Sequence, residues 1–147
     1  MLGLLKWISK SYRETVVYLN NEFKEYGINV TDYVFLVNIY EDSGINQEKI
    51  TQHLSISKTA TSKIVKKLIE LNLITREKSS NDKREFQLSL TKEGKILREL
   101  LLKKVEVWEN EVLKNYKEEE KKDYVKKVEA TYYTSEKLNL SKGDKNG

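Results

Sequence analysis

The sequence contains no cysteine and no proline, and it has one histidine, one methionine and six glycines in 147 residues. Without cysteine there is no disulfide, no thiolate nucleophile and no thiol that could sense an oxidant. The single histidine, His53, cannot build a histidine-rich metal site and is expected to be an ordinary surface residue. We therefore expect neither a metal nor a cofactor.

Long apolar runs are also missing. Residues 1–8 are apolar but include Lys6, are too short to span a bilayer and have no small-residue cleavage site. We expect no membrane segment and a cytoplasmic location. An enzyme is the least supported class of protein, because no nucleophile–base–acid set, phosphate loop or metal cluster is visible.

Positive charge is concentrated in one part of the chain. Residues 55–84 carry eight lysines or arginines against three acids, a net +5, whereas the whole chain is +4. Such local basicity predicts a polyanion partner for this stretch. Since there is no proline, internal repeat or linker, we expect a single domain over residues 1–147.

Two capped helices and a tight corner are predicted within that stretch. Asn46 can cap a helix that runs to Leu54, with Ile45 and Ile50 placed as a hydrophobic staple. Ser55 to Ser57 interrupt this helix, and Ser57 can cap the next one. This pattern is typical of a helix-turn-helix.

The second helix has one apolar and one basic face. Its apolar positions recur at helical spacing and are predicted to be buried: Ala60, Ile64, Leu68 and Leu71. The opposite face carries Thr59, Ser62, Lys63 and Lys66. Asn72 is predicted to end the helix in the left-handed conformation.

Two short strands are predicted next, over residues 73–78 and 85–90. Phe86, Leu88 and Leu90 alternate as in a half-buried strand, and residues 79–82 supply turn chemistry. Together these elements predict a mainly α fold, with a winged helix-turn-helix core in which the hairpin is the wing.

The central part resembles the multiple-antibiotic-resistance regulator (MarR) family. The resemblance depends on the order and spacing of four motifs: Leu54-Ser55-Ile56-Ser57-Lys58, residues 68–74, Asp82-Lys83-Arg84 and residues 90–94. Asp82 and Arg84 match the family's Asp-x-Arg wing signature. Asn72 stands where a glycine is usual, and Thr31 where the second helix often begins with proline.

The resemblance implies a homodimeric regulator that binds a pseudo-palindromic duplex, with repression favoured over activation. By face geometry Thr59, Ser62 and Lys63 are expected at base edges, and Lys58, Lys66 and Lys67 at phosphates. The family pattern places Arg84 in the minor groove, held by Asp82. The DNA-binding candidates are Ser57, Lys58, Thr59, Ser62, Lys63, Lys66, Lys67, Asp82, Lys83 and Arg84.

Interpretations without DNA binding also stay open for these residues. The lysines could form a solvated face, and Arg84 could merely pair with a neighbouring acid. From another functional class, the same surface could serve a winged-helix interaction module that binds an acidic protein.

Long apolar stripes are predicted at both ends of the chain. The first comprises Leu4, Ile8, Tyr12, Val16, Leu19, Phe23 and Tyr26, and the second Leu97, Leu101, Val105, Trp108, Val112 and Tyr116. Thr91 can cap the helix that carries the second stripe, and a final helix follows with Tyr124, Val128 and Leu138. Such stripes belong either to an intramolecular core or to a subunit interface, which the family favours.

The resulting domain scheme has three parts. Residues 1–26 and 92–138 are predicted dimerisation helices, 29–91 the winged helix-turn-helix core, and 139–147 a flexible tail. Within the core, Gly27 ends the first helix, and Asn29 or Thr31 can cap the next one. Its predicted buried face is Tyr33, Leu36, Val37 and Tyr40.

An aromatic effector pocket is a further hypothesis. Tyr12, Tyr33 and Trp108 could stack on a small aromatic anion while Lys10 or Arg13 pairs with its charge. The competing interpretation is that these rings are core residues.

Overall fold

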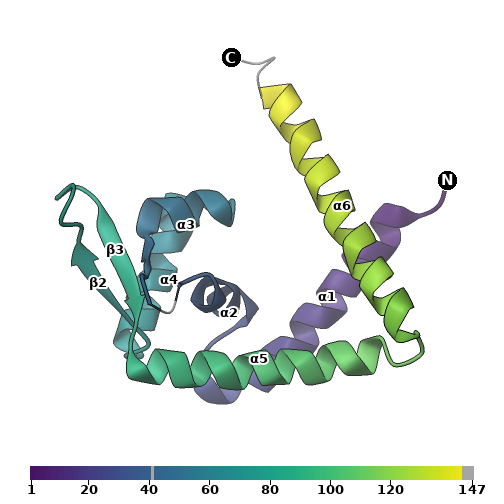
Figure 1. Cartoon of the computed structure of the whole chain (residues 1–147), viewed down its shortest axis with the longest axis horizontal. Helices are drawn as coiled ribbons and strands as arrows, with labels where there is room; N and C mark the ends of the chain where they lie inside the picture. Colours follow the sequence, from purple (N-terminus) through teal and green to yellow (C-terminus); the bar gives the residue numbers. More distant parts are fainter. Residues whose placement is uncertain (41, 144–147) are drawn as a thin grey trace. The chain divides into compact units, whose positions relative to one another are not determined.

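The structure, a computed structural model, describes residues 1–40 and 42–143 and is mainly helical with one small sheet (Figure 1). The predicted fold class is confirmed. The elements are α1 (Leu4–Phe23), a 3-10 turn (Lys24–Tyr26), α2 (Val30–Val37), β1 (Ile45–Asn46), α3 (Gln47–His53), α4 (Lys58–Glu70), β2 (Ile74–Lys78), β3 (Phe86–Leu90), α5 (Lys92–Val112) and α6 (Glu118–Gly143).

The chain divides into two compact units, the first from Met1 to Val105 and the second from Glu106 on, so α5 begins in one and ends in the other. A single domain over residues 1–147 therefore stays a prediction. Among residues 1–40 and 42–143, no helix is both long and apolar enough to cross a membrane.

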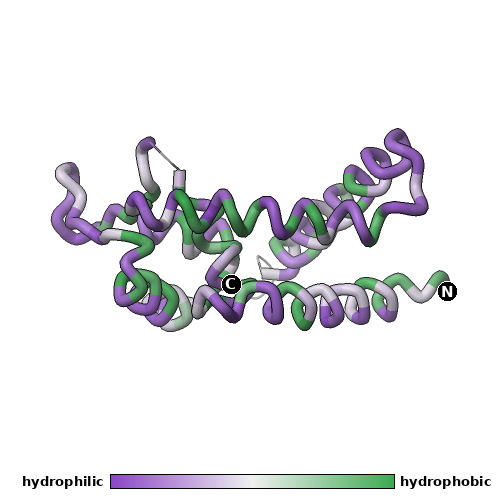
Figure 2. The backbone as a smooth tube through the Cα atoms, turned by 90° about the horizontal axis from the view of Figure 1, so that it is seen from below, coloured by the Kyte–Doolittle hydropathy of each residue, from purple (hydrophilic) through white to green (hydrophobic). Residues whose placement is uncertain are grey.

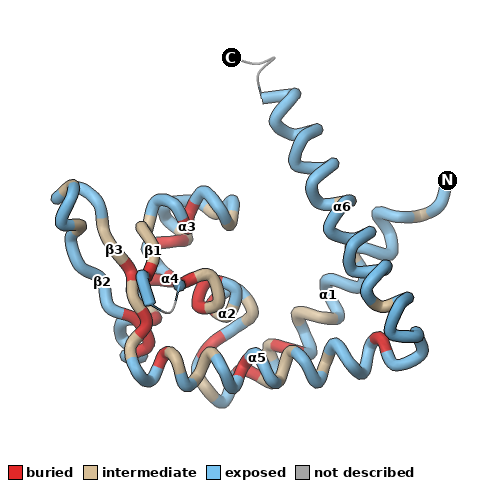
Figure 3. The backbone as a smooth tube through the Cα atoms, viewed as in Figure 1, coloured by how far each residue is buried: buried red, intermediate tan, exposed pale blue. Residues whose placement is uncertain are grey.

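The first unit holds a core shared by its helices and its sheet. Figure 3 shows the buried segments concentrated on α2, α4 and β3. Fully buried apolar side chains come from every layer: Phe23, Phe35, Leu36, Ile50, Leu68, Leu88 and Leu101. Because each such side chain contributes about 1.5–3 kcal/mol when removed from water, this core fixes the relative positions of α3, α4 and the wing.

The connection from α1 to α2 follows the local sequence signals. Gly27 takes the left-handed conformation with φ 72° after the 3-10 turn. Asn29, rather than Thr31, caps α2: its side chain accepts from the Asp32 backbone N–H, and Asp32 in turn accepts from the Asn29 backbone N–H. This reciprocal pair is a capping box.

The buried face of α2 differs from the prediction. Phe35, Leu36 and Ile39 are buried, whereas Tyr40 is 64% exposed and Tyr33 is only half-buried. There are two physical reasons. α2 ends at Val37, so Ile39 and Tyr40 lie beyond its C-cap and do not follow its periodicity. Six of its eight positions, VTDYVFLV, are apolar, so periodicity alone does not fix which face points inward.

A three-stranded antiparallel sheet in the order β1-β3-β2 forms the wing and joins it to α3 and α5. After β3, the Thr91 hydroxyl accepts from the Gly94 backbone N–H at 2.9 Å and so caps α5, as predicted. A Cβ on Gly94 would lie 1.9 Å from the Leu73 carbonyl oxygen. Glycine thus allows α5 to start directly against the turn that follows α4.

The second unit is built very differently. Among residues 106–143 only Leu113 is buried, and every part of α6 is exposed or half-exposed. α6 continues to Gly143, so the tail predicted from 139 begins too early; the Ser141 hydroxyl donates to the Leu138 carbonyl at 2.9 Å within the helix. No proline or glycine interrupts it before Gly143. Residues 144–147 lie outside the described part of the chain.

Candidate nucleic-acid interface

The helix-turn-helix corner is set by caps and by a buried hydroxyl pair. Asn46 caps α3, and the Ser57 hydroxyl accepts from the Ala60 backbone N–H at 3.0 Å to cap α4. Between them Ser55 adopts a left-handed φ of 52°. Inside the corner the hydroxyls of Thr51 and Thr61 lie 2.9 Å apart and are both buried, which binds α3 to α4.

One face of α4 packs inward and the other is open to solvent. The buried positions are Thr61, Ile64, Val65 and Leu68. Leu71, which was predicted to be buried, is 39% exposed because it is the C-cap residue and lies beyond this stripe. Asn72 follows with φ 57°, so the predicted left-handed helix end is confirmed.

The exposed face of α4 carries most of the predicted DNA-binding residues. Exposed on it are Ser57, Lys58, Thr59, Ser62, Lys63 and Lys66. This face carries both hydroxyl and ammonium groups, so it can donate hydrogen bonds to phosphates and can also form hydrogen bonds with base edges.

Lys67 does not belong to that face. Its Nζ lies 2.5 Å from Oδ2 of Asp32, whose side chain is 3% exposed, while the Lys67 side chain is 39% exposed. A buried carboxylate needs a cationic partner, and the Lys67 ammonium supplies it to Asp32 of α2. The ion pair competes with a phosphate for the same ammonium, so the phosphate contact of Lys67 stays a prediction.

The wing presents Arg84 at its tip. The Arg84 backbone N–H and Nε donate to Asp82 Oδ1 at 2.9 and 3.3 Å, and Nη2 lies 3.5 Å from Oδ2. The Arg84 side chain is 91% exposed. Asp82 therefore orients a guanidinium that remains open to a ligand. Lys83, beside it, is exposed as well.

An open cavity of about 200 Å³, lined mainly by polar residues, lies between the wing tip and the starts of α3 and α4. It is lined by Asn46, Gln47, Glu48, Thr51, Lys58, Thr61, Ser62, Arg84, Glu85 and Phe86. Of these ten residues the sequence predicted three as DNA-binding residues, Lys58, Ser62 and Arg84. The other seven were not assigned to the site: Asn46, Gln47, Glu48, Thr51, Thr61, Glu85 and Phe86. The position of Glu85, directly after Arg84, was the signal that could have drawn attention to it.

Arg76 was counted as basic charge but not assigned to the site. Its guanidinium lies 4.5 Å from the centre of the Phe86 ring, across the hairpin. This cation–π contact stiffens the part of the hairpin next to the wing tip, where Phe86 pairs with Lys78. Alternation in β3 predicted Phe86 as an inward residue, but it did not predict which cation would cover its ring.

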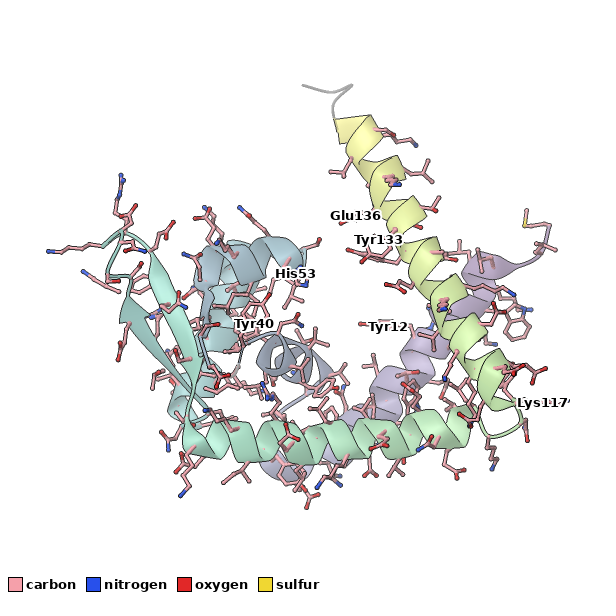
Figure 4. All side chains as sticks on the ribbon, viewed as in Figure 1. Tyr12, Tyr40, His53, Lys117, Tyr133 and Glu136 are labelled. Atoms are coloured by element: carbon pink, nitrogen blue, oxygen red, sulfur yellow. The ribbon has the colours of Figure 1, made fainter. Side chains whose placement is uncertain are left out.

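The proposed effector residues are not brought together at this cavity. Lys10, Tyr12 and Arg13 are exposed on α1, and Figure 4 shows the Tyr12 side chain extending from that helix. The half-buried Tyr33 ring lies 5.4 Å from that of Phe23. Trp108 belongs to the second unit, so a shared pocket stays a prediction. His53, also labelled in Figure 4, is exposed at the end of α3.

A charged cluster joins α1 to α5 within the first unit. Lys104 Nζ lies 3.2 Å from Glu22 and 3.6 Å from Glu25, and 5.8 Å from the centre of the Tyr26 ring. The hydrogen bond to Glu22 raises the pKa of Lys104. Burial and the neighbouring Glu25 raise the pKa of the Tyr26 phenol. Both groups therefore keep their charge state at neutral pH, and the cluster acts as a structural contact.

Known proteins share both this sequence pattern and this fold. A model of the MarR family matches residues 28–86. The HTH-type transcriptional regulator SarZ of Staphylococcus epidermidis is 30% identical over 91 residues, 62% of either chain, so the chain spans less than two thirds of that relative's length.

Two solved structures match almost the whole chain. A MarR transcriptional regulator from Methanosarcina mazei Go1 has a TM-score of 0.85 at 26% identity, covering 92% of this chain and 97% of that one. An uncharacterized SlyA-like transcription regulator from Listeria monocytogenes has a TM-score of 0.79 at 30% identity, covering 92% of both chains.

The fold and the exposed basic helix beside a hairpin define a winged helix-turn-helix protein. With these matches, the chain belongs to the MarR family. The predicted family is therefore confirmed.

Proposed function

We propose that this protein is a transcriptional regulator that binds a specific DNA duplex as a homodimer. The observation that carries the proposal is the exposed basic face of α4 next to a wing arginine held by Asp82. A helix with this face fits the major groove, and an exposed guanidinium fits a narrow minor groove. FabT of Streptococcus pneumoniae, which shares the fold at 17% identity with a TM-score of 0.77, was solved in complex with DNA.

Individual roles follow from position on α4. Thr59, Ser62 and Lys63 are proposed to face bases, and Lys58 and Lys66 to face phosphates. Each phosphate contact releases counterions, so binding should weaken steeply as salt is added. No catalytic role is proposed for any of these residues.

Selection of bound sites from a random duplex pool tests the proposal. We expect a two-fold symmetric motif with half-sites about 10 base pairs apart. Lys63→Ala should reduce selectivity, whereas Lys103→Ala, a matched change of an exposed lysine on α5, should not. Enrichment of no motif would contradict specific DNA binding. Salt-insensitive binding that prefers an acidic protein to duplex would instead support the interaction-module alternative.

Homodimer formation is proposed to use α1, α5 and α6. Figure 2 shows hydrophobic residues recurring along α1 up to its N-terminal end, and these side chains are exposed: Leu4 59%, Leu5 81%, Trp7 59% and Ile8 48%. The apolar side chains of α6 are exposed too, among them Val128 at 53%. Exposed apolar surface on this scale marks a protein interface.

A charge placed on that surface tests the dimer. Ile8→Glu should convert a dimer into a monomer in sedimentation velocity while the first unit stays folded. Lys6→Glu changes the charge by two units, twice the change in Ile8→Glu, but on another face of α1, and it should leave the dimer intact. A dimer that survives Ile8→Glu would show that this part of α1 is not the interface.

Repression and effector control complete the proposal. A dimer bound to a promoter blocks it by occlusion alone, which makes repression the simplest outcome for a cytoplasmic regulator.

A planar aromatic anion could stack on Tyr12 or Tyr33 and pair with Lys10 or Arg13. If this anion bound the DNA-free protein more tightly than the DNA-bound protein by about 1.4 kcal/mol, DNA affinity would fall tenfold.

The effector proposal separates two kinds of signal. Salicylate is expected to release the protein from its DNA, and peroxide is not, because the chain has no cysteine. A fluorescence titration of labelled duplex measures both. Release by peroxide that a thiol reductant reverses would contradict the argument, and failure of every aromatic acid would remove the effector.

A further inference from the structure

Glu85 lies where the wing tip meets the strand ladder. The Ser79 backbone N–H donates to the Glu85 carbonyl at 2.8 Å, and the Glu85 N–H donates to the Asp82 carbonyl at 3.0 Å. The ladder begins one residue later, where Phe86 pairs with Lys78. The backbone of Glu85 thus closes the tip that carries Arg84.

The side chain of Glu85 joins this tip to α3. Nδ2 of Asn46 donates to Oε2 of Glu85 at 2.9 Å, across 39 positions of sequence. Oδ1 of the same Asn46 accepts from the backbone N–H groups of Glu48 and Lys49 at 2.9 and 3.1 Å, which caps α3. Asn46 therefore connects the start of α3 to the wing tip. We name the Asn46–Glu85 hydrogen bond the tether.

The tether borders the polar cavity rather than a packed core. Asn46, Arg84 and Glu85 line it together with Lys58 and Ser62 of α4. Where a cavity replaces interlocked side chains, the position of an element depends on the polar contacts that cross or border it. Pairing of Asn46 with Gln87 already holds β3 beside the start of α3, so the tether extends this connection by two residues to the tip. The direction in which Arg84 leaves the tip, relative to α4, therefore depends on the tether.

We propose that Glu85 is a positioning residue for DNA reading: through Asn46 it holds Arg84 at a fixed place relative to α4, although its own carboxylate repels phosphate. The inference rests on the proposed function. Glu85 then has two opposite effects on DNA binding, one on the preference for flanking sequence and one on general affinity. The tether raises the preference for A·T-rich flanks, because that preference needs an arginine aimed at the minor groove. The charge lowers affinity for every duplex.

Three variants separate these effects in the full-length protein. Glu85→Ala should bind random duplex about threefold more tightly while its preference for A·T-rich over G·C-rich flanks falls about fivefold. Glu85→Gln removes the charge but keeps an acceptor for Asn46, so it should gain the same general affinity and keep the preference. Glu77→Gln, which removes another exposed wing carboxylate, controls for charge alone.

Asn46→Asp tests the other end of the tether. The aspartate keeps an oxygen to cap α3, but it cannot donate to Glu85 and repels it. It should lose the flank preference about as far as Glu85→Ala, with the thermal midpoint of unfolding showing that the fold is retained. The readout is fluorescence anisotropy with paired duplexes that differ only in their flanks.

The outcomes distinguish this inference from the proposed function. If the wild-type protein binds duplex and prefers A·T-rich flanks but Glu85→Ala keeps that preference, the tether has no positioning role. If Glu85→Gln loses the preference as fully as Glu85→Ala, charge rather than the hydrogen bond is responsible, and the inference is again overturned. If the wild-type protein binds no duplex, the proposed function fails first.

Discussion

The two units of the chain hold their shape by different means. The first has a core that draws on α1, α2, α3, α4, the sheet and α5, with Phe35, Leu68 and Leu88 fully buried. In the second, α6 has no buried residue, and its contacts are local pairs such as Glu118–Lys121 and Asp123–Lys127. A helix supported only in this way is marginal in water, so α6 needs apolar partners to be stable. DNA reading and assembly should therefore be separable by mutation.

The largest expected effect contrasts a core residue with an exposed one. Phe35→Ala should lower the free energy of unfolding by about 3–5 kcal/mol, because it leaves a cavity where the ring was fully buried. Tyr132→Ala, at a side chain 53% exposed, should change it by less than about 0.5 kcal/mol in the monomer while weakening the dimer. Urea unfolding at low protein concentration and sedimentation measure the two quantities. Equal destabilisation by both would contradict the division into a core unit and an assembly unit.

A second contrast lies within α4, between neighbouring lysines. Lys67→Met should lower stability by about 1–2 kcal/mol, because it leaves the buried Asp32 carboxylate without its ammonium, a loss reduced by the partial exposure of Lys67. It should leave the salt dependence of DNA binding unchanged. Lys66→Met should do the reverse, keeping stability and lowering the salt slope by about one unit. If Lys67→Met lowered the slope as much as Lys66→Met, then Lys67 would be a phosphate contact after all.

Local chemistry allowed much of the first unit to be predicted. Side-chain caps act over three residues, so Asn46, Ser57 and Thr91 identified helix starts that the structure confirms. The left-handed Asn72 and the pairing of Asp82 with Arg84 are equally local. Each of these features is decided by neighbours in sequence.

Features that depend on distant residues were missed. The apolar pattern of residues 33–40 did not reveal that α2 ends at Val37, so it could not show that Tyr40, beyond that end, is exposed. Lys67 lies 35 positions from Asp32, and Glu85 lies 39 from Asn46. Helical spacing from Ala60 and Ile64 places Lys67, unlike Lys66, beside the apolar face of α4. The local sequence does not reveal the buried carboxylate, because only the fold brings Asp32 within reach of Lys67.

A third, smaller effect compares two cations on the wing tip. Arg84→Ala should lose about tenfold in preference for A·T-rich flanks, or about 1.4 kcal/mol, because the oriented guanidinium is removed. Lys83→Ala should weaken all duplexes about equally, since a lysine acts mainly as a point charge. Competition binding with matched flanks measures both. Equal loss of preference in the two variants would mean that Asp82 does not give Arg84 a special role.

The smallest effect tests the local support of α6 directly. The hydrogen bond from Lys121 Nζ to Glu118 Oε1, at 2.6 Å, lowers the pKa of the Glu118 carboxyl below its usual value of 4.5. Because the folded pKa lies below the unfolded one, this contact supports α6 fully above the unfolded value and is lost as the pH falls through the folded pKa. NMR titration of the Glu118 carboxyl should show the lowered pKa, and Lys121→Gln should return it towards the usual range while the first unit stays unchanged. A Glu118 that titrates normally in the wild-type protein would show that even this local pair contributes nothing, which would leave the start of α6 dependent on assembly alone.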